Sequence, residues 1–234
     1  MQSILRLTLL CCCLWPTFAV ADPFQAGLSA LERGHYSTAM RAWLNLAKEG
    51  APEGQNNAGH MYEEGYGVSQ NYAQAMKWYK QAADQGLPEA EHNVGMLYYH
   101  GYGTAKNERV AVKWFKRAAQ QGLADSEYML GLAYHQGNGV PLDYEFAKYW
   151  FLKSAKQSYA NGQFMLAFMF QAGDGGDSEP FKALVWSELA RRNGKADASD
   201  ISDLSKLLVA DEEIPKAITY ADECVKTNYE KCPQ

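Results

Sequence analysis

The sequence lacks three features that would each indicate a particular class of protein. It has no basic excess, because 22 Lys and Arg stand against 27 Asp and Glu, for a net charge of −5. Nucleic-acid binding is therefore disfavoured, since affinity for phosphate backbones comes largely from clustered Lys and Arg. It has no uninterrupted apolar run of about 20 residues, the length that a membrane span needs. It also has few cysteines, five in all.

The longest apolar run lies at the N-terminus and is typical of a cleaved secretory signal. Arg6 precedes the apolar residues 7–14, and the small residues of Ala19-Val20-Ala21 follow them. This is the order of a basic start, an apolar centre and a cleavage site. We expect residues 1–21 to be removed, which leaves an exported protein with no stable membrane span. The periplasm is the expected compartment, with secretion as the alternative.

Two other interpretations of this segment stay open. A retained membrane anchor is the second choice, although Pro16 and Thr17 interrupt the apolar stretch. Lipidation at Cys11 is the third, although the bulky Leu9 and Leu10 stand where such signals have small residues.

Cleavage would leave two cysteines, Cys224 and Cys232. Two cysteines in an exported chain most often pair, so we expect a disulfide that clips the C-terminus. Two independent thiols are the alternative. Neither cysteine is expected to be a nucleophile, because the chain has no Cys-x-x-Cys motif and no His beside either one.

The most abundant feature is a repeat of 36 residues. Four Gly-x-Gly triplets keep this step, and so do four tryptophans; the triplets begin at Gly65, Gly101, Gly137 and Gly173, and the tryptophans are Trp78, Trp114, Trp150 and Trp186. A unit of this size cannot bury its apolar side alone and must stack on its neighbours. The period therefore predicts an elongated solenoid.

Each unit is predicted to be a pair of helices joined by the Gly-x-Gly turn. In one unit the first helix covers 88–100, and the second covers 107–121, where Asn107 can accept from the free N–H groups of the helix start. The second helix carries an apolar stripe with helical spacing, made of Ala111, Trp114, Phe115, Ala118 and Ala119. We expect the tryptophans to be buried between one pair and the next.

These residues resemble the Sel-one-like repeat family, relatives of the tetratricopeptide repeats. The resemblance rests on Asn93-Val94-Gly95-Met96-Leu97-Tyr98-Tyr99-His100-Gly101-Tyr102-Gly103 and on the stripe of the second helix. It implies an all-α, right-handed α-α superhelix, in an exported member of bacterial type. Residues 55–194 are expected to form four such repeats, the last weakened because Ala167 stands where the other units have Gly.

The ends of the chain are expected to differ from the repeats. Residues 22–54 resemble an ordinary tetratricopeptide hairpin with a shorter turn. Residues 195–234 lose the period but keep helical spacing, and they are acidic. We expect them to form a helical cap with a polar outer face, because the end of a solenoid must cover its last apolar surface.

The resemblance implies that the first helix of each pair lines a concave groove. The positions beside its core stripe hold four of the five histidines together with carboxylates and aromatic residues, and the candidate binding residues are His60, Glu63, Glu64, His92, Met96, Tyr99, His100, Tyr128, His135, Phe164 and Phe168. Carboxylates toward the N-terminal half favour a basic ligand, and aromatic residues supply affinity. We expect the imidazoles to make binding sensitive to pH.

The family resemblance implies a non-enzymatic scaffold or adaptor of the cell envelope, and we expect its groove to bind a peptide or protein partner without a cofactor. A secreted protein that binds host molecules is the alternative. An enzyme that binds or weakly hydrolyses β-lactams, as some relatives do, is less favoured, because no Ser has Lys three places on and Lys-Thr-Gly is absent. A metal site at His100 and His135 is disfavoured too, since zinc usually needs four ligands.

Overall fold

The structure is a computed structural model that describes residues 22–234, so the predicted signal segment lies outside the described residues. Within 22–234 the chain forms twelve helices and no strand. Their bounds are α1 (Pro23–Glu32), α2 (Tyr36–Lys48), α3 (Pro52–Glu64), α4 (Tyr72–Asp84), α5 (Pro88–His100), α6 (Glu108–Gln120), α7 (Ala124–Gln136), α8 (Tyr144–Lys156), α9 (Ala160–Ala172), α10 (Pro180–Arg192), α11 (Ala198–Lys206) and α12 (Glu213–Lys226). The predicted all-α solenoid is confirmed.

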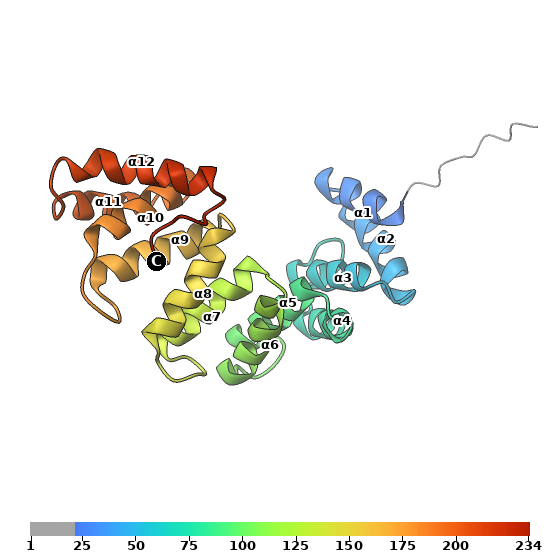
Figure 1. Ribbon diagram of the computed structural model, residues 1–234. Helices are drawn as coiled ribbons and strands as arrows, with labels where there is room; N and C mark the ends of the chain where they lie inside the picture. The colour runs from blue at the N-terminus through green and yellow to red at the C-terminus, as the bar shows by residue number, and fades with distance from the viewer. Residues whose placement is uncertain (1–21) are drawn as a thin grey trace, which may run out of the picture.

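The helix pairs follow one another along an arc (Figure 1). In this view α3 and α5 lie on the inner edge of the arc, and their partners α4 and α6 lie on the outer edge. The last pair, α9 and α10, is followed by α11 and α12 at the C-terminal end. The odd-numbered helices of the repeats therefore form the inner face and the even-numbered helices the outer face.

The two glycines of each Gly-x-Gly turn are required for different structural reasons. Gly101 ends α5 with φ of 79°, a left-handed conformation that glycine adopts without a steric penalty. Gly103 lies against the preceding repeat, where an added methyl group would come within 2.7 Å of the Tyr72 backbone. Asn107 then caps α6, and its side-chain oxygen accepts from the backbone N–H of Val110. The turn both reverses the chain and lets two repeats approach.

A glycine in the middle of each inner helix lies against an aromatic ring of the next helix. A methyl group at Gly95 would come within 2.5 Å of the Phe115 ring, and the same contact pairs Gly131 with Phe151. In the last repeat Ala167 replaces the glycine. Twenty residues later Ser187 stands where the other repeats have the ring. The larger Ala167 is thus matched by the smaller Ser187. This explains why the last repeat can do without the glycine.

The expected burial of the tryptophans is wrong for two of the four. Trp78 and Trp114 are half-buried, whereas the residues directly after them, Tyr79 and Phe115, are 0% and 1% exposed. Tyr79 and Phe115 point into the core, so the indole of the tryptophan before each of them lies at the edge of the core. There the Arg117 guanidinium lies 4.5 Å from the centre of the Trp114 ring. Trp150 and Trp186, by contrast, are buried.

A buried polar contact recurs within each repeat, between its first helix and the end of its second helix. Four side chains at the same repeat position bond to a partner 30 residues later, in the pairs Gln55 with Gln85, Glu91 with Gln121, Glu127 with Gln157, and Gln163 with Asn193. A carboxylate occurs only where a cation also reaches it. Arg117 lies 2.7 Å from Glu91, and Lys153 lies 3.0 Å from Glu127. Each buried charge is therefore paired, as a low-dielectric site requires.

The C-terminal residues fold back over the last repeat. Cys224 and Cys232 form the expected disulfide, which closes the chain after α12. Beyond it, the Trp186 indole N–H donates to the Pro233 carbonyl at 2.9 Å. The disulfide and this bond hold the tail against α10.

The predicted C-terminal cap exposes apolar residues as well as the expected polar ones such as Asp211 and Glu212. Leu204, Leu207 and Leu208 are 49%, 81% and 57% exposed, and Ile218 and Val225 on α12 are exposed as well. The reason is geometric. Helix α11 has nine residues and buries Ile201, but no later element covers the leucines near its end.

Candidate binding surface on the inner face

The inner helices carry charge of one sign. Helices α1, α3, α5, α7 and α9 contain no Lys or Arg, and their charged residues other than His are Glu32, Glu53, Glu63, Glu64, Glu89, Glu91, Asp125 and Glu127. Most residues of opposite sign lie on the outer helices, such as Arg41, Lys77 and Lys113 at one repeat position. The solenoid therefore has an acidic inner face and a more basic outer face.

At the N-terminal end of this face, α3 presents the first predicted residues. His60 and Glu64 are exposed and available to a ligand. Glu63 is half-buried, and its carboxylate accepts from the Tyr79 hydroxyl at 2.6 Å. Burial, and then the neighbouring Glu63, raise the pKa of Tyr79, so the phenol stays protonated and keeps donating this bond. Glu63 is therefore a structural acceptor as well as a groove carboxylate.

In the centre of the face, α5 places its two histidines differently. His92 Nδ1 lies 2.8 Å from the Ser126 hydroxyl of α7, and the ring packs against Phe115. Burial lowers the pKa of His92, against a smaller opposing effect of Asp125. His100 is exposed and stacks on Tyr102. The first histidine joins two repeats, and the second is free to contact a ligand.

The third predicted group lies on α7 and is also tied to the following repeat. His135 Nε2 lies 2.7 Å from the Asp174 carboxylate, which belongs to the next Gly-x-Gly turn. The His135 ring also makes an edge contact with Phe168 of α9. Tyr128 packs against Phe151. Half of the predicted groove histidines thus hold the repeats together.

The remaining predicted side chains are partly covered. Met96 and Tyr99 of α5 are half-buried, and they pack against the core of the next repeat. Phe164 of α9 is half-buried under Lys195, whose Nζ lies 5.2 Å from the ring centre. Phe168 is the exposed aromatic residue of α9. Fewer aromatic side chains are therefore exposed in the groove than the sequence predicted.

An apolar pocket of about 330 Å³ opens where α9 meets α11. Its lining residues are Phe168, Gln171, Ala172, Asp200, Ile201 and Leu204. The Ser205 hydroxyl donates to the Gln171 side chain at 2.6 Å and fixes α11 against α9. Because His135 contacts Phe168, the pocket continues the inner face. Of its lining residues, only Phe168 was predicted as a binding residue.

The α11 side of this pocket has no signal in the sequence pattern. Ile201 and Leu204 follow helical spacing within the predicted cap, but nothing in that spacing shows which helix packs against α9. No group of three or more His, Cys, Asp or Glu side chains within 22–234 is arranged to hold a metal ion. His100 and His135 belong to no such group. In the same range, no helix is long and apolar enough to cross a membrane.

Comparison with known families and structures adds the following. The Sel1 repeat model matches residues 52–87, 88–123, 124–159 and 160–195. A Sel1 repeat protein from Oxalobacter formigenes is 26% identical with a TM-score of 0.73, over 89% of this chain and 84% of that one. A protective antigen of uropathogenic Escherichia coli with the same type of fold is 28% identical with a TM-score of 0.71, over 84% of this chain. The match covers 46% of that antigen, so this chain corresponds to about half of its length.

A more distant likeness extends to an immunity protein from Pseudomonas aeruginosa. It is 14% identical with a TM-score of 0.54, over 89% of this chain and 84% of that one. At this identity the likeness concerns the fold alone. None of the curated proteins matches the sequence.

Proposed function

Because this chain belongs to the Sel1 repeat family, whose members generally act as protein-interaction scaffolds, we propose that it is a non-enzymatic adaptor of the cell envelope. It binds a segment of another protein along its inner face. The observation that carries this proposal is the combination of inner helices without Lys or Arg and an apolar pocket at the end of the inner face.

The two parts of the face select different parts of a ligand. Exposed carboxylates such as Glu53, Glu64 and Glu89 favour Lys or Arg in the ligand, and they act mainly on the rate and specificity of association. The pocket beside Phe168 and Leu204 accepts one aliphatic or aromatic side chain, and such desolvated anchors supply most of the affinity in protein interfaces. The proposed ligand is a basic segment with one apolar anchor.

The proposed compartment is the periplasm, with the extracellular space as the alternative. The predicted signal at 1–21 and the disulfide between Cys224 and Cys232 support an oxidising location. The signal segment and the disulfide both lie outside the proposed binding surface, so they support the compartment independently of the binding proposal.

Photo-crosslinking in intact cells tests partner and compartment together. A photoreactive residue replaces Phe168 in one variant and the exposed Gln120 of the outer face in a control. We expect a crosslinked envelope protein at position 168 only, joined through a segment with Lys or Arg near an apolar side chain. An identical set of products from both positions would refute the proposal.

Two leucine variants of the full protein refine the test. Leu204→Asp places a charge in the pocket, whereas Leu207→Asp alters a more exposed leucine that does not line it. We expect the first change to weaken binding of the crosslinked segment at least about tenfold, roughly 1.4 kcal/mol, and the second to leave it nearly unchanged. Equal affinities for both variants would exclude the pocket as the anchor site.

A further inference from the structure

The outer face of α8 has an exposed apolar stripe. Leu142, Phe146 and Tyr149 are spaced along one side of this helix and its N-terminal end, and they are 54%, 50% and 53% exposed. Phe146 rests against Tyr134 and lies near Tyr149. The stripe belongs to the outer face, and the proposed function of the inner face makes no use of it.

The other repeats show that folding does not require apolar residues at these positions. Where α8 has Leu142, the two preceding repeats have Gln70 and Lys106. At the position of Tyr149 they have Lys77 and Lys113. At the position of Phe146 they have Gln74 and Val110, so the first of these two repeats is built with polar or charged side chains at all three positions.

A pair of residues between successive repeats also changes from polar to apolar along the chain. Lys80 donates to the Tyr98 hydroxyl at 3.0 Å between the earlier repeats. At the corresponding positions two repeats later the chain has Leu152 and Phe170. A polar contact is therefore replaced by apolar surface next to the stripe.

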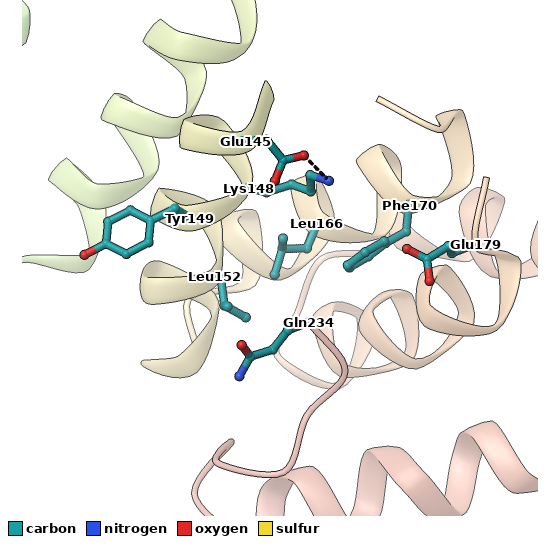
Figure 2. A pocket seen from close by; sticks show the side chains of 8 residues that line it. All are labelled: Glu145, Lys148, Tyr149, Leu152, Leu166, Phe170, Glu179 and Gln234. Carbon is teal, nitrogen blue, oxygen red and sulfur yellow. Dashed lines mark ion pairs between the residues drawn. The ribbon is translucent and has the colours of Figure 1, made fainter. Parts of the chain in front are cut away.

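This replacement coincides with a hollow of about 320 Å³ that is lined by residues of α8 and α9. Figure 2 shows Leu152, Leu166 and Phe170 around the hollow, with Tyr149 toward one side and the last residue, Gln234, toward another. At its edge Glu145 and Lys148 are paired at 2.8 Å. Tyr149 belongs to both the hollow and the stripe, so the two form one surface.

Beside this surface lie two exposed lysines of the preceding outer helix and one exposed carboxylate, Asp143, which is next to Leu142 and accepts from the Phe146 N–H. Lys113 and Lys116 are exposed on α6, the preceding outer helix, and neither forms an ion pair within residues 22–234. The carboxylates near the hollow, Glu145 and Glu179, are each paired with a lysine. An acidic partner would thus find free cations on the α6 side.

We propose that this outer surface of α8 binds an acidic amphipathic helix of another protein. The apolar side of that helix lies along Leu142, Phe146 and Tyr149, one of its side chains enters the hollow, and its carboxylates face Lys113 and Lys116. Amphipathic helices that dock in grooves are recognised through apolar residues with this type of spacing. A hollow that takes a single side chain favours a protein ligand over the flat surface of a bilayer.

A displayed library of single-helix peptides, selected on the purified full protein, tests the proposal. The matched variant is L142K/F146Q/Y149K, which introduces the side chains that earlier repeats have at these positions. We expect enriched peptides to share an apolar stripe with Asp or Glu beside it, and to bind the variant at least about tenfold more weakly. Exchange of their acidic residues for Lys should abolish binding to the unaltered protein.

Three results would overturn the inference, provided that circular dichroism shows the same thermal unfolding for both proteins. The first is enriched peptides that bind protein and variant equally. The second is binding to vesicles of phosphatidylcholine and phosphatidylglycerol that the variant loses, which would assign the stripe to a membrane surface. The third is a dimer in sedimentation that the variant dissolves, which would assign it to a second copy. The Leu204→Asp variant should bind the selected peptides normally, and this separates the test from that of the inner face.

Discussion

At the scale of single residues, the glycine in the middle of an inner helix is required because an aromatic ring of the next helix leaves no room for a side chain. Glycine in a helix interior usually costs about 1 kcal/mol relative to alanine. Gly131 persists because a methyl group there would come within 2.5 Å of the Phe151 ring. Ala167 is tolerated because Ser187 replaces the ring in the last repeat.

Gly131→Ala should therefore destabilise the protein although alanine is the better helix former. We expect a loss of about 1–3 kcal/mol in the free energy of unfolding, the usual cost of overpacking, measured by urea titration. Ala167→Gly is the matched control at the same repeat position, and it should cost about 1 kcal/mol through helix propensity. A more stable Gly131→Ala protein would show that the ring moves aside without penalty.

His92 gives the protein a dependence on pH at the residue scale. Burial holds its pKa below the ordinary value of 6.5. Below pH 6.5 the unfolded chain therefore binds a proton that the folded protein takes up only at lower pH. The contribution of neutral His92 to stability is complete above this pH and is lost as the pH falls toward the lower, folded-state pKa.

His92→Gln should accordingly reduce the loss of stability on acidification. We expect the urea midpoint of the unaltered protein to fall more than that of the variant between about pH 7.5 and about pH 5.5. His60→Gln, at an exposed histidine, serves as the control and should follow the unaltered protein. Parallel profiles for all three proteins would remove His92 as the cause.

At the scale of elements, the two helices of each repeat are joined by one polar position with two forms. Gln55 meets neutral side chains, and its repeat equivalent Glu91 meets Arg117 at 2.7 Å. The Glu91 side chain is 2% exposed, whereas that of Arg117 is 46% exposed. The carboxylate is thus the buried partner, and the cation lies at the surface.

Arg117→Gln should leave this carboxylate without its cation and destabilise the protein by about 1–3 kcal/mol. Adding Glu91→Gln recreates the combination of Gln55 with Gln81 found one repeat earlier, and should restore most of the loss. Urea titration of the two single variants and the double variant measures the coupling. Additive effects would mean that the ion pair contributes nothing of its own.

At the scale of the whole molecule, the solenoid has two faces of different charge and two unlike ends. The arc in Figure 1 separates the acidic inner helices from the outer ones. The C-terminal end is closed by the disulfide and by the bond of Trp186 to Pro233. Because repeats contact chiefly their neighbours, a change at one end should act locally.

Removal of the disulfide by Cys224→Ser and Cys232→Ser tests this locality. A loop this short stabilises by roughly 2–3 kcal/mol in the chain-entropy description. We expect faster amide hydrogen exchange in α10 and α12, with α3 to α6 unchanged. A uniform increase along the chain would show that the solenoid unfolds as a single unit.

The sequence by itself determined the repeat, the helix pairs and their boundaries. Glycines that reach left-handed dihedrals and Asn107 at a helix start act through the few residues around them. The spacing of 36 residues then fixes one structure for every unit. These signals are local or periodic, so they can be recognised without knowledge of what each side chain contacts.

Only the tertiary structure decided which side chains are available on the two faces. His92 and His135 are taken up by Ser126 and Asp174 of the following repeat, while the pocket beside Phe168 exists because α11 packs on α9. Helical spacing places a residue on a face, but its exposure depends on which side chain the neighbouring repeat sets opposite it. That neighbour lies more than 30 residues away, beyond the reach of any local pattern.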